Sequence, residues 1–487
     1  MSAPGPSDKV TTSLEQVNTW AEHHLPELTK LATEIWHHAE LRYEEMQSMQ
    51  AQQRVLRDAG FELTTGVAGI PTAFSAQVGS HGPVVALLGE YDALSGLSQR
   101  AGVAVPDPLH PGGNGHGCGH HLLGTAALGA VLVLRDYLQA SGQPGIVRYY
   151  GCPAEEGGSG KTFMVREGVF DDVSFALTWH PATTNTLFPG RSLANIQCAF
   201  HFSGIAAHAS AAPHLGRSAL DAVELMNIGA NYLREHLPPA AKLHYAVTNT
   251  GGTSPNVVQA EAEVLYLMRA VDDQATRAVF DRVQDVARGA ALMTGTRLTL
   301  KFEKACSSFQ ANQALSEVVS RILGQVGAPT FDDADEVFAA QIQATLPPEA
   351  IQGDRQVLRS GKSSAVFARD VIPYSAEKAQ ELLPGSTDVA DVSWVAPTAQ
   401  FMAACYALGT QAHSWQQVAQ GLEPAAFKGM LQAVKVLAGT AITVLEDPEL
   451  LAQIREEHAT RRAEVPYVSP IPADVLPPVN RTFEGQG

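Results

Sequence analysis

Three apolar segments that each end in polar, ligand-type residues constrain this chain most strongly. They begin PVVALLG (83–89), GIVRYYG (145–151) and SFALTW (174–179), and such continuous apolar runs are typical of strands buried on both faces of a sheet. In open α/β sheets, sites form beyond the carboxyl ends of the strands. We therefore expect one rim of the sheet to gather the residues that follow these strands: Asp92, Glu155, Glu156 and His180.

A glycine-rich turn carries further ligand-type side chains. In GNGHGCGHHLLGTAALGA, residues 113–130, Cys118 and His120 flank Gly119 just before an apolar, helix-like run. Gly119 allows the backbone to bend so that both side chains point to one side of a tight turn. A hydrolytic metal site needs such sulfur and nitrogen donors, an open position for water and a base close by. The stretch therefore predicts a metal site.

The adjacent Glu155 and Glu156 suit two different tasks in such a site. Neighbouring side chains point in different directions from an extended strand end, so one carboxylate can bind a metal while the other faces the attacking water. His180 and, in GTQAHSW, His413 are the remaining candidate ligands. Simpler interpretations stay open, because a Glu-Glu pair is most often a solvated surface feature and a strand-end histidine is more often capped or packed in a core.

Other residues that attract notice also have structural interpretations. His208 in GIAAHAS can be a strand-end residue, Asn256 in TSPNVV can form a turn, and Arg269 can be an exposed charge on a strand. EEGGSGKT ends like a phosphate-binding loop, but Glu155 occupies the position of the first glycine, so this motif fails. Four cysteines are interpreted as packing residues: Cys152, Cys198, Cys306 and Cys405.

The order of the expected elements changes near residue 194. Helices at 14–37 and 44–60 and the three apolar strands come first. A strand, helix, strand, strand, helix, strand order then follows, which is the split β-α-β layout of a ferredoxin-like domain. This predicts an α/β mixed-sheet catalytic domain in two parts, 1–193 and 310–487, with the ferredoxin-like domain inserted at 194–309. Within the second part we expect 330–385 to be irregular and polar, and the chain from 465 to wrap over the surface.

The bulk properties exclude some partners. The 487 residues carry a formal net charge of −17, which argues against nucleic acid or an anionic membrane as the main partner. No uninterrupted apolar run reaches the roughly 18 residues of a membrane span, and MSAPGPSDKV has no signal-peptide pattern. Five widely spaced cysteines in a long chain argue against a disulfide framework. We therefore expect a reducing, cytoplasmic location.

Eight ordered stretches resemble the M20 metallopeptidase family, specifically its amidohydrolase branch, in which a Cys-Gly-His turn replaces the bridging aspartate motif. The resemblance runs from about residue 25 to about residue 475. The stretches are GEYDALSGLSQ, GHGCGHHLLGTAA, GCPAEEGGSGKTFMVREGVFDDV, ALTWHP, GIAAHAS, PHLGRSALDAV, SPNVVQAEAEVLYLMRA and STDVADVSW.

The resemblance implies a two-metal centre, usually manganese or zinc, in a catalytic domain interrupted by a lid or dimerisation domain. It implies that Glu155 is the general base and that Asp92 supports the site from the strand end. It also implies a homodimer, or a heterodimer with a related subunit, in which His208 reaches the partner's active site. The implied metal ligands are Cys118, His120, Glu156, His180 and His413. The implied substrate contacts are His208, Asn256 and Arg269.

The expected reaction is hydrolysis of the amide bond of a small N-acyl amino acid, which suits p-aminobenzoyl-glutamate. Glu155 would take a proton from water and pass it to the leaving amine, and Arg269 with Asn256 would bind the substrate carboxylate. A dipeptidase, another N-acyl-amino-acid hydrolase or a non-catalytic partner subunit are the alternatives. The complete ligand set argues against a non-catalytic partner subunit. His121 departs from the branch, which often has aspartate there, and could alter the surroundings of the metals or add a donor.

Overall fold

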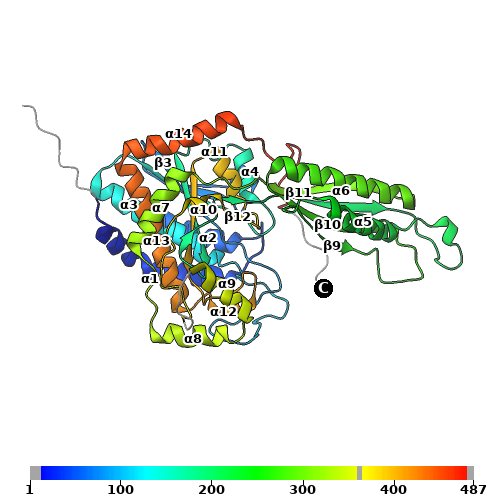
Figure 1. The fold of residues 1–487 in the computed structure, drawn as a ribbon, viewed down its shortest axis with the longest axis horizontal. Coiled ribbons are helices and arrows are strands. Elements are labelled where there is room, and N and C mark those ends of the chain that lie inside the picture. The colour runs from blue at the N-terminus through cyan, green and yellow to red at the C-terminus, as the bar shows by residue number, and fades with distance from the viewer. Residues whose placement is uncertain (1–11, 359–364, 480–487) are drawn as a thin grey trace, which may run out of the picture.

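The computed structural model describes residues 12–358 and 365–479. Its larger part is built on a mixed seven-stranded sheet, with the strand order β1-β2-β4-β3-β5-β13-β6 (Figure 1). The four central strands, β4, β3, β5 and β13, run parallel, which confirms the predicted mixed α/β class. The strands are β1 Glu62–Thr65, β2 Phe74–Val78, β3 Val84–Gly89, β4 Ile146–Gly151, β5 Phe175–Ala182, β6 Thr186–Leu187 and β13 Thr398–Ala404.

Helices cover both faces of this sheet, which is why its central strands are apolar throughout. Val85 and Leu87 of β3 belong to the core with α1, α3, α7 and α13, whereas Ala86 and Leu88 face the core with α4 and α11. The helices of the larger part are α1 Leu14–His38, α2 Met46–Asp58, α3 His120–Ser141, α4 Gly160–Arg166, α7 Gln313–Val326, α11 Val389–Val395, α12 Trp415–Gln420, α13 Pro424–Glu446 and α14 Pro448–Glu464.

The helices α3 and α13 lie at the centre of the larger part. Each is long and apolar enough to cross a bilayer by length and composition. Most of each helix is nevertheless buried inside the molecule, where the two pack against each other and α1 packs against both. An apolar helix in the core of a folded domain passes the same test, so these two helices are weak evidence for a membrane span.

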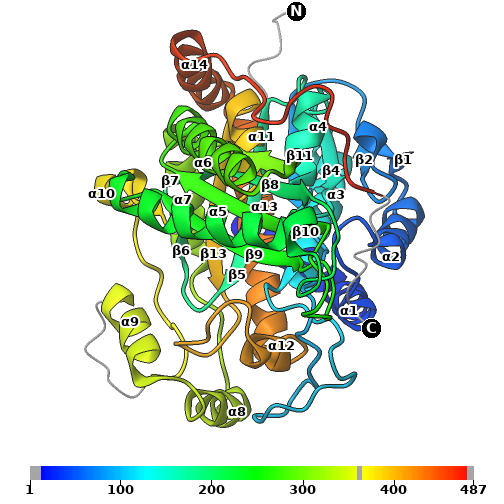
Figure 2. The ribbon, with the colours of Figure 1, turned by 90° about the vertical axis from the view of Figure 1, so that its right-hand side faces the viewer.

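A second sheet of four antiparallel strands lies beside the larger part, in the order β11-β8-β10-β9 (Figure 1). Its two helices cover one face and stand in front in Figure 2. Along the chain the order is β8 Ala194–Ser203, α5 Ala219–Leu233, β9 Lys242–Asn249, β10 Glu261–Ala270, α6 Asp273–Thr294 and β11 Arg297–Cys306. This is the split β-α-β layout; its first strand along the chain begins at Ala194 and its last strand ends at Cys306.

The prediction for 330–385 is wrong in part. This segment contains three helices and a short strand, α8 Asp333–Gln343, α9 Pro348–Leu358, α10 Ala376–Gln380 and β12 Leu382–Leu383, which pairs with β7 Arg191–Ser192. A capping box at Asp332 and Asp335 starts α8, and proline at the first position starts α9. We expected prolines and polar residues to prevent regular structure, whereas here they mark where short helices begin.

Candidate metal centre and active site

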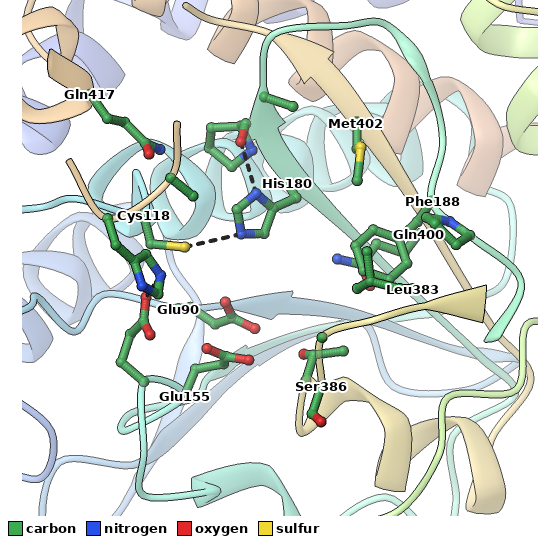
Figure 3. A pocket seen from close by; sticks show the side chains of 18 of the residues that line it. Glu90, Cys118, Glu155, His180, Phe188, Leu383, Ser386, Gln400, Met402 and Gln417 are labelled. Atoms are coloured by element: carbon green, nitrogen blue, oxygen red, sulfur yellow. Dashed lines mark hydrogen bonds and ion pairs between the residues drawn. The ribbon is translucent and has the colours of Figure 1, made fainter. Parts of the chain in front are cut away.

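The carboxyl ends of the parallel strands bring the expected side chains together. Asp92 follows β3, Glu155 and Glu156 follow β4, and His180 lies near the end of β5. Figure 3 shows Cys118, Glu90, Glu155 and His180 facing the same space. The turn before α3 supplies Cys118 and His120, and the loop after β13 supplies His413.

The Cys-Gly-His turn takes its shape from Gly119, which has φ +77° in the left-handed region. A Cβ atom there would collide with the Tyr406 hydroxyl, so glycine is required both by conformation and by space. The turn places the Cys118 Sγ 3.4 Å from the His180 Nε2. His120 begins α3 directly after the glycine and is buried.

Hydrogen bonds fix how His120 and His180 face the cluster. The Nδ1 of His180 donates to the Pro181 carbonyl over 2.8 Å, and the Nδ1 of His120 lies 2.8 Å from the Asp92 Oδ1. Both rings therefore turn their Nε2 atoms inward, as metal-binding histidines with a carboxylate or carbonyl behind them do. Burial, followed by the charge of His120, lowers the pKa of His180 to about 4. This keeps the His180 imidazole neutral, the form that binds metals.

Asp92 connects the histidine to the glutamate pair. Its Oδ2 accepts a hydrogen bond of 2.8 Å from the Glu156 backbone N–H, while its Oδ1 faces His120. The carboxylate is buried and does not reach the donors' shared space itself. Asp92 therefore orients a candidate ligand from each of two elements, which is the supporting position expected of it.

The two adjacent glutamates point in different directions. Glu156 lies with Cys118 and His413, and its Oε1 is 3.1 Å from the His413 Nε2. Burial raises the pKa of Glu156, but the His413 hydrogen bond and the charges of His120 and His413 outweigh it and lower the pKa to about 2. Glu155 instead lies with Glu90 and His120. Burial, and then the charges of Glu90 and Glu156, raise the pKa of Glu155 well above its usual value.

The donor atoms fit two divalent cations. One group consists of Cys118, His120 and His180, and a second of Cys118, Glu156 and His413, with the donor atoms in each group within 4.8 Å of one another. The His120 Nε2 is buried and makes no hydrogen bond, although the Glu90 Oε2 lies 3.3 Å away, and a bound ion would give this atom a partner. Cys118 belongs to both groups, so its sulfur would help to hold either ion.

Backbone strain is concentrated at this cluster. His413 has φ +60°, and Ala154, directly before the glutamate pair, has φ +62°. Non-glycine residues adopt such angles rarely, and they do so mostly at functional sites that the surrounding structure holds in place. The backbone N–H of His413 donates to the Gly117 carbonyl over 2.7 Å. That bond holds the His413 loop against the Cys-Gly-His turn.

Sequence reasoning missed three charged residues behind the cluster: Glu90, Lys161 and Asp388. The Lys161 Nζ lies 2.7 Å from the Glu90 Oε1 and 2.6 Å from the Asp388 Oδ1, and all three side chains are buried. Glu90 also approaches the His120 Nε2 at 3.3 Å. Glu90 precedes Asp92 by two residues, so strand alternation could have placed it at the same rim. Lys161 belongs to the stretch that failed as a phosphate loop.

His121 lies outside the cluster of donors. Its Nε2 donates to the Gly421 carbonyl over 2.8 Å, and its ring lies 5.0 Å from that of His116 between centroids. Burial, followed by the charge of His116, lowers the pKa of His121 well below its usual value. His121 is therefore a neutral core residue that ties α3 to the end of α12, and it adds no donor to the site.

A cavity of about 700 Å³ opens beside the donors and reaches the second sheet. Arg269 lines it from β10, and its Nε donates to the Ser386 Oγ over 3.3 Å. Figure 3 shows an apolar wall on the side away from Cys118, formed by Phe188, Leu383 and Met402. The segment 330–385 also contributes Asp354 and Val357 of α9 to the cavity lining.

His208 and Asn256 do not line this cavity. Both are exposed and lie beyond Ser203, where β8 ends. Because β8 starts at the cavity and is ten residues long, its far end is roughly 30 Å away. The two residues do lie together, since the Ala209 N–H donates to the Asn256 carbonyl. The structure thus brings together eight of the ten predicted site residues within one chain and leaves these two apart.

Comparison with known proteins agrees with the resemblance in sequence. The family model described as "Peptidase family M20/M25/M40" matches residues 86–443. The chain belongs to this family. It is therefore an amidohydrolase.

Individual relatives cover nearly the whole chain. One of the subunits of p-aminobenzoyl-glutamate hydrolase from Escherichia coli is 50% identical over 460 residues, which cover 92% of this chain and 95% of that protein. The Xaa-Arg dipeptidase of Mus musculus is 27% identical and covers 90% of each chain. A dinuclear metal-binding M20 peptidase from Bacillus subtilis shares the fold, with a TM-score of 0.55, 18% identity, and coverage of 87% of this chain and 99% of that structure.

Proposed function

We propose that this chain hydrolyses the amide bond of an N-acyl amino acid and that p-aminobenzoyl-glutamate is its substrate. The observation that carries the proposal is the cluster of five donors with Glu155 beside it. The substrate comes from the 50% identity to one component of a p-aminobenzoyl-glutamate hydrolase. A catalytic role for the chain itself is favoured over a purely supporting one, because all five candidate donors and the candidate base lie at one site.

Two divalent ions, Mn²⁺ or Zn²⁺, would be held by Cys118, His120, Glu156, His180 and His413. When bound, they would polarise the amide carbonyl and acidify the attacking water. Glu155 is the remaining carboxylate at the mouth of the cluster, and its task is to accept the proton of that water. The same carboxyl group then donates the proton to the nitrogen of the leaving amine.

The cavity walls suit the two ends of an aryl-acyl amino acid. Phe188, Leu383 and Met402 offer an apolar surface for an aromatic ring. Arg269 offers a guanidinium group for a carboxylate, and such pairs are often bidentate. Burial lowers the pKa of Arg269, which leaves a partly desolvated cation that gains from an anionic partner.

We further propose that the active site is completed by a second subunit, either another copy or a related chain. His208 lies too far from the donors to act within its own chain, and backbone N–H groups of Ser210 and Ala211 donate to its Nδ1. Its Nε2 therefore carries the proton and can donate a hydrogen bond to a developing oxyanion. Two different subunits of p-aminobenzoyl-glutamate hydrolase from Escherichia coli are relatives of this chain, which supports a heteromeric arrangement.

The test is release of p-aminobenzoate from p-aminobenzoyl-glutamate by the purified chain, with and without added Mn²⁺. The matched control is Glu155→Gln, which keeps the shape of the side chain. We expect metal-dependent hydrolysis that falls by at least about a hundredfold in the variant, with metal content unchanged. Absence of hydrolysis by the metal-loaded chain, alone and together with a counterpart of the other Escherichia coli subunit, would contradict the proposal.

A further inference from the structure

The second sheet forms one wall of the cavity. That wall carries a lysine, Lys304, to which the proposed reaction assigns no role. On the face away from α5 and α6, the paired residues are Asn195 with Arg269 and Gln197 with Leu267, and all four line the cavity. On the other side of β8, Lys304 of β11 pairs with Gln197 and also lines the cavity. The wall therefore presents Arg269 and Lys304 on opposite sides of β8.

A break in strand register places Lys304 on this wall. Phe302 pairs with Cys198, but the next partner of β8, Gln197, pairs with Lys304, so Glu303 is an extra residue in β11. A β-bulge of this kind re-aims side chains and is common beside active sites. Glu303 accepts a hydrogen bond of 2.8 Å from the Gln197 Nε2, so it too lies on the cavity side.

The ammonium group of Lys304 makes no close ion pair in the part of the chain that the structure describes, although its charge acts on Glu303 at longer range. The side chain is only 7% exposed, yet no ion pair within 4.0 Å joins it to any residue in 12–358 or 365–479. Lys161, the other buried lysine at the site, has two such partners. A lysine is almost never buried without a partner. A ligand that brings its own negative charge would supply that partner.

We propose that Lys304 binds the side-chain carboxylate of an acidic amino acid in the leaving group, while Arg269 binds the α-carboxylate. The inference rests on the proposed function and sharpens it, because it makes the enzyme selective for N-acyl glutamate or aspartate. Arg269 and Lys304 lie two strand spacings apart and are offset by two residues along β8, which gives roughly 12 Å between backbones. Their long side chains can close most of that distance, so they can meet two carboxylates of one amino acid.

The test compares two conjugates of the same shape, p-aminobenzoyl-glutamate and p-aminobenzoyl-glutamine. The second carries an uncharged amide where the first carries its side-chain carboxylate. We expect the wild type to prefer the glutamate conjugate, and Lys304→Met to raise KM for it by about 30-fold, the scale of one lost charge-assisted hydrogen bond. For the glutamine conjugate kcat/KM should change less than about threefold. Lys304→Arg should keep the preference for glutamate.

The matched control is Lys301→Met, because Lys301 lies on the same strand but is exposed and outside the cavity. It should leave both conjugates unaffected. Equal losses for the two conjugates in Lys304→Met would assign Lys304 to general electrostatics or folding, and unchanged kinetics would remove it from the site. If the wild type hydrolyses both conjugates without preference, this inference fails alone. If it hydrolyses neither with added Mn²⁺, the proposed function fails.

Discussion

The buried triangle of Glu90, Lys161 and Asp388 makes a prediction about stability. Lys161→Met removes the cation that contacts both carboxylates. Methionine has nearly the same length and fills the same space, so the change isolates the charge. Asp388 also accepts a hydrogen bond of 2.8 Å from the Lys161 backbone N–H, which the substitution leaves in place. Glu90 and Asp388 would then be two buried carboxylates without their shared counter-ion.

Breaking a buried ion pair by removing one partner is destabilising by about 3–5 kcal/mol. The larger part of the molecule, outside 194–309, has roughly 370 residues. At about 2.1 cal/mol/K per residue, its entropy of unfolding is near 0.8 kcal/mol/K. A loss of about 4 kcal/mol therefore lowers the melting temperature by about 5 °C.

The assay is thermal unfolding of four proteins: wild type, Lys161→Met, Asp388→Asn and the double variant. Removing the second charge as well relieves part of the penalty. The fall in melting temperature of the double variant should therefore be smaller than the sum of the falls in the two single variants. Lys301→Met, an exposed lysine, serves as the control and should stay within about 1 °C of wild type. If the melting temperature of Lys161→Met also stays within about 1 °C of wild type, the reasoning is refuted. That result would mean that water or another group satisfies the two carboxylates without Lys161.

Three further predictions concern the site, the assembly and the response to acid. Cys118→Ala should lose bound metal and activity together, measured by elemental analysis; full metal occupancy would make the thiol structural. Mixing inactive His208→Ala and Glu155→Gln chains should restore up to about a quarter of wild-type activity if dimers assort randomly, and no recovery after verified subunit exchange would confine His208 to its own chain. Burial lowers the pKa of His458 to about 4, whereas in the unfolded chain it is near 6.5. Between these two pH values the unfolded chain binds a proton that the folded chain does not, so the folded state should lose stability as pH falls from about 6.5 toward 4. His458→Gln should flatten that decline, and an unchanged pH profile of the melting temperature would contradict it.

The catalytic sheet and its rim could be predicted because their patterns are local. Continuous apolar strands indicate burial on both faces, and the residues directly after them must lie at the carboxyl edge. That reasoning placed Asp92, Glu155, Glu156 and His180 at one rim from spacing alone. His413 lies far along the chain from that rim, so spacing did not place it there; it was a candidate ligand by residue type, and the family resemblance implied the same role.

What the sequence could not show depends on contacts between distant elements. Lys161 and Asp388 are 227 positions apart, and neither has a pattern that marks it as buried. His121 was ambiguous because a histidine that begins a helix can face a metal or a core, and only the packing against Gly421 decides. The helices within 330–385 were missed because short helices depend on caps and tertiary contacts more than on periodicity.

The two sheets contribute different groups of residues to the site, and the difference follows from how each sheet is covered by helices. The seven-stranded sheet is covered on both faces. The residues at its rim are therefore held by buried neighbours such as Asp92 and the triangle of Glu90, Lys161 and Asp388. A substitution of one of these residues should disturb the positions of the others. The second sheet is covered by helices on one face only, and its other face contributes side chains to the cavity at alternate positions. Arg269 and Lys304 occupy such positions, so they can be exchanged without repacking the core beneath them. We therefore expect substitutions on the cavity face of β10 and β11 to alter KM between substrates while the candidate metal ligands stay in place.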